Sequence, residues 1–203
     1  LGEDICAPRT IELACHEALF ADLPAHTQQA LLPVREQLAQ RFGSVAMLDA
    51  PLPEREAVYL AFRQIQGYEA WQSQGGNIER LGMQLGPDVA ERFAWGKAVT
   101  GAQFDAACQL RDTFTAWWQS QLGNRILIMP TVPDIAPLLS ATAQEIAATR
   151  RVSHDLLLIA VLTRRPQVNI PVTTLDGAPL GISLLGPCGS DALLVSMATT
   201  FMP

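Results

Sequence analysis

Hydrophobic residues recur at helical spacing over most of the first 123 residues, which predicts a largely helical region. Residues 10–42 should be helical, with a stop at Gly43, where a glycine suits the end of a helix. The apolar stripe consists of Leu13, Leu19, Phe20, Leu31, Val34, Leu38 and Phe42. Only residues 44–48 interrupt this pattern, as a short strand.

Three further helices are expected before residue 124. The first runs over residues 54–74, because Gly75-Gly76-Asn77 follows it as a helix-ending sequence. The second begins at Gly86-Pro87-Asp88, since proline favours the first turn of a helix and acidic residues favour its positive end. The third runs over 100–122, opened by Thr100 and Gln103 at the spacing of a capping box.

After residue 124 the pattern changes to short apolar runs separated by turn residues. Residues 125–130 predict a buried strand, and a proline-rich loop follows to residue 137. Thr142 and Glu145 have capping-box spacing and open a helix to about residue 162. Strands are expected over 168–173 and 180–185, separated by a loop longer than a two-residue hairpin that contains Asp176-Gly177. A last helix should run from Ser190 to about residue 199.

This order of elements predicts an α/β fold in which helices flank a mixed β-sheet. The whole chain, 1–203, is expected to form part of one domain. Its helical region covers about 10–123 and its strand-containing core about 125–203.

Composition narrows the classes of partner. The net charge of −6 argues against nucleic acid, which needs a basic surface. No arginine cluster exceeds two residues and no apolar run approaches the length of a membrane span, so we expect no membrane association. Only 17% of residues are charged while 49% are hydrophobic, which predicts a surface that normally faces another polypeptide segment.

The cysteines and the amino terminus indicate a cytoplasmic protein. Four cysteines are scattered without a CxxC pair, as in proteins of a reducing compartment: Cys6, Cys15, Cys108 and Cys188. The first residues lack the basic segment of a signal peptide. Because Leu1 is not methionine, we expect the amino terminus of the polypeptide to lie elsewhere.

The second half carries a series of motifs in a characteristic order. An aliphatic strand ends in Pro-Thr-Val-Pro at 130–133, Pro-Gln-Val-Asn-Ile-Pro follows at 166–171, and Asp-Gly-Ala-Pro-Leu-Gly-Ile-Ser-Leu-Leu-Gly-Pro occupies 176–187. Gly-Ser-Asp at 189–191 then opens the last helix. In order and spacing these motifs resemble the carboxy-terminal half of the amidase-signature family, and in style its short members similar to indoleacetamide hydrolases.

The resemblance implies an amide hydrolase that cleaves the C–N bond of a small carboxamide through a serine acyl-enzyme, without metal or cofactor. It places Pro130, Thr131, Pro166 and Gln167 near the substrate. The glycines of these motifs and Pro179 have a simpler interpretation as turn and packing residues.

The catalytic residues of that family have no counterpart here. The family uses a lysine on a strand and two serines in a Gly/Ser-rich loop, whereas this chain has no adjacent serines and one lysine, Lys97, beside a helix end. We therefore expect the nucleophile and its base in a preceding amino-terminal half, the implied partner, and no activity from these residues alone. Exposed apolar surface would then favour self-association.

Other candidate residues have structural interpretations that outweigh functional ones. His16, His26 and His154 are widely separated, and Ser183 is one position out of step with a Gly-x-Ser-x-Gly motif. Arg164-Arg165 stand where the family usually has small residues. They either disturb packing, face an acidic substrate, or mark a site that has drifted from the family's. Two alternatives stay open: a non-catalytic remnant that binds a partner or ligand, and an unrelated α/β binding protein.

Overall fold

The computed structural model describes residues 12–201. Cys6, Leu1 and the start of the helix expected from residue 10 lie outside the described residues. The described residues divide into two compact units, residues 12–52 with 118–201 and residues 53–117. Each unit is described by itself.

The first unit is built on a mixed five-stranded sheet in the order β2-β1-β3-β5-β4. Its strands are β1 Leu13–His16, β2 Val45–Leu48, β3 Ile126–Pro130, β4 Gln167–Leu175 and β5 Ala178–Leu185. β1 is parallel to both β2 and β3, whereas β5 is antiparallel to β3 and β4. The helices of this unit are α1 Ala18–Ala21, α2 Ala25–Phe42, α6 Ala143–Thr163 and α7 Asp191–Phe201.

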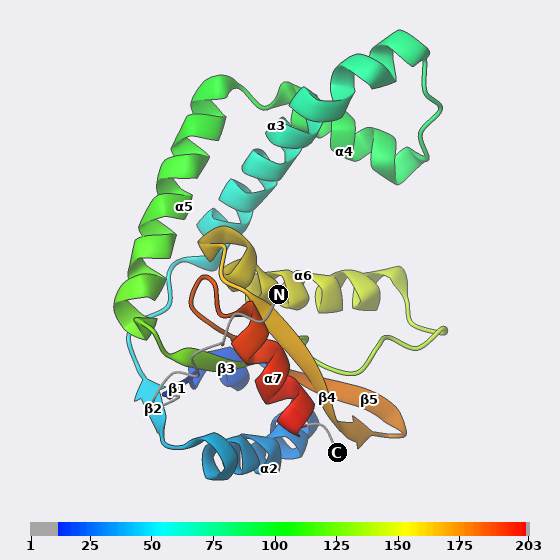
Figure 1. The fold of residues 1–203 in the computed structure, drawn as a ribbon. Helices are drawn as coiled ribbons and strands as arrows, with labels where there is room; N and C mark the ends of the chain where they lie inside the picture. The colour runs from blue at the N-terminus through cyan, green and yellow to red at the C-terminus, as the bar shows by residue number, and fades with distance from the viewer. Residues whose placement is uncertain (1–11, 202–203) are drawn as a thin grey trace, which may run out of the picture. The chain divides into compact units, whose positions relative to one another are not determined.

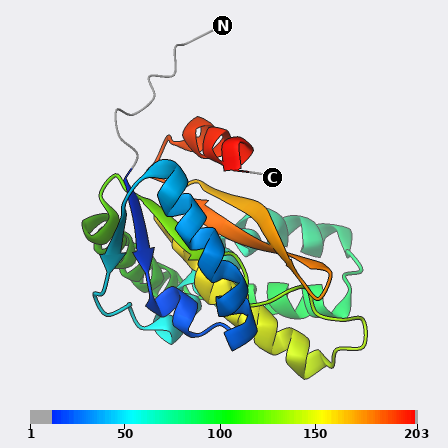
Figure 2. The same ribbon diagram turned by 90° about the horizontal axis from the view of Figure 1, so that it is seen from below.

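Helices cover both faces of this sheet. α2 lies on one face and α6 on the opposite face, as the two perpendicular views show (Figures 1 and 2). α7 and α2 both contact β4. Every residue of β1 and β3 is therefore buried, as expected for strands covered on two sides. The predicted α/β fold with helices around a mixed sheet is confirmed.

The second unit is helical. It contains α3 Arg55–Leu81, α4 Pro87–Ala98 and most of α5 Gly101–Leu122. Its small core joins Ala61 and Ile65 of α3 to Ala107 of α5. α3 and α4 approach closely where Gly96 faces Gly67, because a Cβ on Gly96 would lie 2.5 Å from the carbonyl oxygen of Gly67.

The helical structure predicted over residues 10–42 is wrong at its beginning. Leu13–His16 form the strand β1, which pairs with a neighbour on each side, and helical structure starts only at Ala18. Four consecutive buried residues suit a strand enclosed by a sheet as well as a helix, so periodicity could not distinguish them.

Two predicted boundaries also differ from the structure. Gly75-Gly76 do not end α3, which continues to Leu81 and stops at Gly82, whose φ of 57° is left-handed. Gly75 instead leaves room for the ring of Trp71. The connection between β4 and β5 is a two-residue turn rather than a longer loop, because Asp176 and Gly177 both adopt positive φ.

Candidate functional site

Four polar side chains meet across three strands at the carboxyl end of β3. Thr131 follows this strand directly, and its Oγ1 lies 2.7 Å from Asn169 Oδ1 on β4 and 2.7 Å from Ser183 Oγ on β5. Gln167 Nε2 donates to the same Ser183 Oγ at 2.7 Å. We call Thr131, Gln167, Asn169 and Ser183 the polar cluster.

The sheet register explains why these residues meet. Ser183 is directly opposite both Met129 on β3 and Asn169 on β4. Gln167 and Asn169 are two positions apart on one strand, and such residues share a face. Gly181 completes the arrangement, because the Asn169 side chain lies where a Cβ on Gly181 would be, only 2.3 Å from Asn169 Oδ1.

The hydrogen bonds of the cluster have a defined direction. Thr131 has one hydroxyl proton, which it donates to Asn169 Oδ1. Ser183 must then donate its own proton to Thr131 Oγ1, and it accepts from Gln167 Nε2. The fully buried Ser183 hydroxyl is thus both donor and acceptor, as a buried polar group requires.

The loop after Thr131 is fixed to the start of α2 by Asp134. Its carboxylate accepts from His26 Nε2 at 2.8 Å, Thr27 Oγ1 at 3.2 Å and the backbone N–H of Ile135 at 2.8 Å. Burial opposes ionisation of Asp134, but the hydrogen bonds from His26 and Ile135 outweigh it and hold the pKa of Asp134 below its ordinary value. This contact holds the Pro-rich loop next to the carboxyl end of β3, where the polar cluster lies.

The carboxyl end of β1 is occupied by structural contacts. His16 is buried, its Nε2 lies 2.8 Å from the carbonyl oxygen of Ala50, and its ring meets Trp118 edge-on at 6.3 Å. Beside it, Cys15 accepts from Arg35 Nη2 at 3.2 Å, and Arg35 also pairs with Glu17. Burial raises the pKa of the Cys15 thiol to about 11, outweighing the Arg35 guanidinium, so this thiol is a poor nucleophile.

All four residues predicted near the substrate lie in the polar cluster or directly beside one of its residues in the chain. Thr131 and Gln167 both contact Ser183, and Pro130 is the last residue of β3, paired with Ile182. Pro166 directly precedes β4, and its carbonyl accepts from the backbone N–H of Gly186. Sequence reasoning missed the roles of Ser183 and Asn169. Their signal is the polar residues at alternate positions of otherwise apolar strands.

Among the described residues, neither arginine of the pair hydrogen-bonds to the polar cluster. Arg164 ends α6 in a left-handed conformation with φ of 55°. Arg165 is 6% exposed, and its Nη2 donates to Gln119 Oε1 at 2.6 Å and to the carbonyl of Gly123 at 3.1 Å. These acceptors lie at the carboxyl end of α5, where a cation is favourable. The contacts give Arg165 a helix-capping role.

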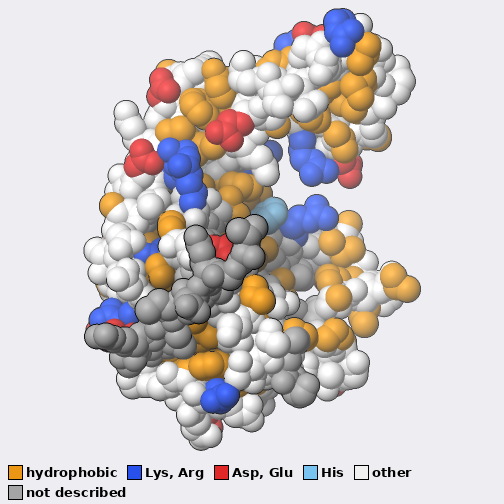
Figure 3. Space-filling view, viewed as in Figure 1, with side chains coloured by type: hydrophobic (Ala, Val, Ile, Leu, Met, Phe, Trp, Pro, Cys, Tyr) orange, Lys and Arg blue, Asp and Glu red, His pale blue; other side chains and the backbone are white. Residues whose placement is uncertain are grey.

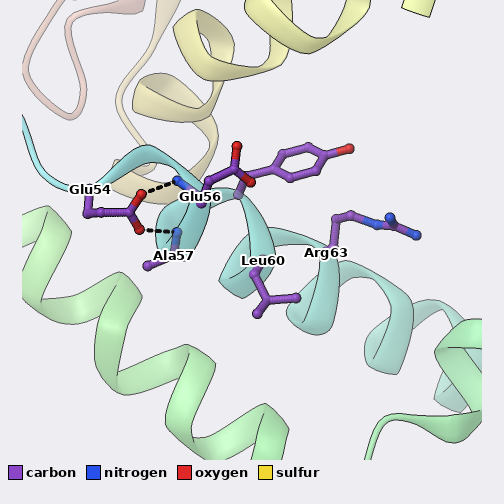
Figure 4. A pocket seen from close by; sticks show the side chains of 6 residues that line it. Glu54, Glu56, Ala57, Leu60 and Arg63 are labelled. Carbon is purple, nitrogen blue, oxygen red and sulfur yellow. Dashed lines mark hydrogen bonds between the residues drawn. The ribbon is translucent and has the colours of Figure 1, made fainter.

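The second unit has an open pocket beside the start of α3. The pocket has a volume of about 410 Å³ and is lined by Glu54, Glu56, Ala57, Tyr59, Leu60 and Arg63 (Figure 4). Glu54 caps α3 by accepting from the backbone N–H groups of Glu56 and Ala57. The Arg63 guanidinium lies 4.5 Å from the centre of the Trp95 ring. Glu54 and Arg63 therefore make structural contacts at this pocket.

Lys97 also has a structural environment. It lies in the last turn of α4, where its Nζ is 2.6 Å from Glu79 Oε1 and 5.0 Å from the centre of the Trp71 ring. A lysine that acts as a base is usually buried and unpaired, whereas this side chain is 55% exposed. Within residues 12–201 no group of three His, Cys, Asp or Glu side chains could hold a metal ion.

Comparison with known proteins shows that the chain is similar in sequence to amidases. No family model matches the chain. It is 26% identical to Amidase 1 of Arabidopsis thaliana over 147 residues, 72% of this chain and 35% of the relative. It is 29% identical to the 6-aminohexanoate-cyclic-dimer hydrolase of Pseudomonas sp. (strain NK87) over 60% of this chain and 29% of the relative. The chain thus spans about a third of the length of these curated relatives.

The fold gives the same result over nearly the whole chain. A bacterial aryl acylamidase of the amidase-signature family superimposes with a TM-score of 0.76 and 15% identity, covering 95% of this chain and 43% of that one. The coverage fits the carboxy-terminal half suggested by the motif order. The chain therefore has the fold of part of an amidase-signature enzyme, and its sequence is similar to amidases.

Proposed function

We propose that this chain is the carboxy-terminal portion of an amidase that hydrolyses the C–N bond of a small carboxamide. The observation that carries the proposal is the agreement of two lines: motif order in the sequence, and a fold shared with amidase-signature enzymes over 95% of the chain. Similarity to Amidase 1 supports the same activity.

The reaction requires groups that these 203 residues do not contain. A serine oxygen attacks the carboxamide carbon, the C–N bond breaks with release of ammonia, and water then hydrolyses the acyl-serine. The sequence has no adjacent serines, and Lys97 is paired with Glu79. The two serines and the lysine are therefore proposed to come from a preceding segment, the partner of this chain.

This chain would contribute the sheet and part of the substrate-pocket wall. Pro130 and Thr131 stand at the carboxyl end of β3, the end at which α/β sheets bind ligands. Gln167 is connected to Thr131 through Ser183, and Pro166 shapes the start of β4. We assign these four residues to the wall and none of them to the chemical step.

The test is reconstitution of the two portions. The 203-residue chain alone should release no ammonia from indole-3-acetamide or from small aliphatic amides. Mixed or co-expressed with the segment that precedes Leu1 in its source polypeptide, it should hydrolyse at least one of them. Replacing the candidate nucleophilic serine of that segment by alanine should abolish the activity. A folded complex that cleaves no amide in a broad panel would contradict the proposal.

The missing serine pair also favours a second candidate, a non-catalytic remnant that binds a partner or ligand. The two accounts differ in what precedes Leu1. Intact mass and sequencing of the source polypeptide should reveal a strand lysine and a Gly/Ser-rich loop if the amidase account holds. A polypeptide that lacks both would make the remnant the better account.

A cytoplasmic location is proposed from cysteine usage. Cys15, Cys108 and Cys188 are free, as in reducing compartments. No helix within residues 12–201 is both long and apolar enough to cross a membrane.

A further inference from the structure

The polar cluster leaves two complementary groups without a partner. Asn169 Oδ1 accepts a hydrogen bond from Thr131, and Gln167 Nε2 donates one to Ser183. Among the described residues, Asn169 Nδ2 and Gln167 Oε1 have no hydrogen-bond partner. Asn169 is exposed and Gln167 is half-buried, so a donor and an acceptor are both accessible.

These two groups belong to side chains on one face of the same strand. Gln167 and Asn169 are on the same face of β4, about 7 Å apart along the strand. The Gln167 side chain extends toward Asn169, because it reaches Ser183, the residue directly opposite Asn169. The two amide groups bond to neighbouring hydroxyls whose oxygens are 2.7 Å apart.

Their orientation is fixed by the protein. The Asn169 oxygen is held by Thr131, and its side chain lies in the space left by Gly181, so its nitrogen is the free end. The Gln167 nitrogen is held by Ser183, so its oxygen is the free end. Preorganised polar groups bind with little ordering cost and reject ligands that leave them unpaired.

We propose that Asn169 and Gln167 form a carboxamide-binding site and that Asn169 is a specificity-determining residue. A carboxamide carries a carbonyl acceptor and an N–H donor side by side. Asn169 Nδ2 donates to the carbonyl oxygen, and the amide N–H donates to Gln167 Oε1. A carboxylate or ester of the same size lacks that N–H. The inference deepens the proposed function, since it assigns amide selection to this chain.

The test is a binding titration of the 203-residue chain. Propionamide is added while the side-chain amide resonances of Asn169 and Gln167 are followed by NMR, with propionate and methyl propionate as comparisons. Propionamide should shift both resonances and bind at least about tenfold more tightly than either comparison, the discrimination expected of a site built to bond an N–H. Equal binding of all three, or shifts confined to other residues, would overturn the proposal.

Asn169→Asp isolates the donor. Aspartate still accepts from Thr131 but has no outward N–H, so the cluster is kept while propionamide affinity falls at least about tenfold. Asn77→Asp, on α3 where Oδ1 accepts from Arg80, is the matched control and should leave affinity unchanged. A fully retained affinity in Asn169→Asp would remove Asn169 from the site.

Gly181→Ala tests the orientation of Asn169. Its methyl group would lie 2.3 Å from Asn169 Oδ1 and must displace the amide, whereas Gly76→Ala adds a methyl in open space. The first should weaken propionamide binding and the second should not.

If the isolated chain is not monodisperse, the same titrations apply to the reconstituted protein. Amide binding without hydrolysis would contradict only the proposed function, and hydrolysis with unchanged amide selectivity in Asn169→Asp would contradict only this inference.

Discussion

At the scale of single residues, Asp134 controls how the loop after β3 is held. Its carboxylate accepts three hydrogen bonds, from His26, Thr27 and the backbone of Ile135. Asp134→Asn should lower the free energy of unfolding at pH 7 by up to about 1 kcal/mol, the range of partly exposed ion pairs. Denaturant titration measures this loss. Asp105→Asn, at an exposed position of α5, is the control and should change little.

The same residue predicts a pH dependence. The folded-state pKa of Asp134 is below its ordinary value, so its stabilising contribution is complete above the unfolded pKa of about 3.9 and is lost as pH falls through the folded pKa. The difference in unfolding free energy between wild type and Asp134→Asn should therefore shrink between about pH 4 and the folded pKa. A difference that stays constant through this acidic range would contradict the assignment.

The cysteines should differ in reactivity. Burial raises the pKa of Cys15 to about 11, whereas Cys188 is exposed. Because the thiolate is the reactive form, iodoacetamide at pH 8 should alkylate Cys188 and leave Cys15 unmodified in the native chain. Peptide mass spectrometry locates the modified residue. In denaturant both cysteines should react, which serves as the control. Rapid alkylation of Cys15 in the native chain would contradict its burial.

At the scale of elements, packing decides where sequence signals fail. The buried run Leu13–His16 has no alternation that marks a strand, and only its pairing with β2 and β3 makes it one. Gly75-Gly76 resembles a helix end, yet the helix continues because Trp71 packs over Gly75. The capping box of Thr142 and Glu145 was predictable because it is a local interaction, and the structure confirms it.

The polar cluster shows that sequence-based prediction of the candidate site has the same limit. Thr131 and Gln167 were identified from motifs, but Ser183 and Asn169 acquire a role only through strand register. The register depends on contacts between residues that are far apart in the sequence, and no local pattern encodes such contacts. Thr131 is 38 positions from Asn169 and 52 positions from Ser183. The residue types were visible in the sequence, whereas their meeting point was not.

The contact between α3 and α4 gives a prediction at this scale. A Cβ on Gly96 would lie 2.5 Å from the Gly67 carbonyl oxygen, and backbone cannot move aside easily. Gly96→Ala should destabilise the chain by about 1–3 kcal/mol through overpacking, although alanine is the better helix former. Gly101→Ala, with open space around its Cβ, should not destabilise it. Thermal unfolding followed by circular dichroism compares them, and equal stability of the two variants would contradict the close approach.

At the scale of the whole molecule, the described residues leave apolar surface uncovered. In the second unit, Leu81, Met83 and Val89 are exposed around the connection between α3 and α4, and hydrophobic side chains are visible there in Figure 3. In the first unit, Leu138 and Leu139 are exposed in the loop before α6. Surface of this kind is typical of a segment that contacts further polypeptide.

The outer strand β2 also leaves apolar surface uncovered. It is entirely apolar, Val45 to Leu48, its Met47 is 54% exposed, and its pairing is parallel, a type of sheet that is normally covered. An apolar strand at the edge of a sheet is a template for pairing with another chain.

We therefore predict that the 203-residue chain self-associates when isolated and becomes monodisperse when the preceding segment is supplied. Sedimentation velocity over a range of concentrations measures both states. Met47→Lys should reduce self-association, because a charge at an outer strand opposes edge pairing. Gln144→Lys, at an exposed position of α6, is the control and should leave association unchanged. A monomeric, cooperatively unfolding isolated chain would instead favour the non-catalytic remnant, since such a chain needs no complementing half to cover its sheet.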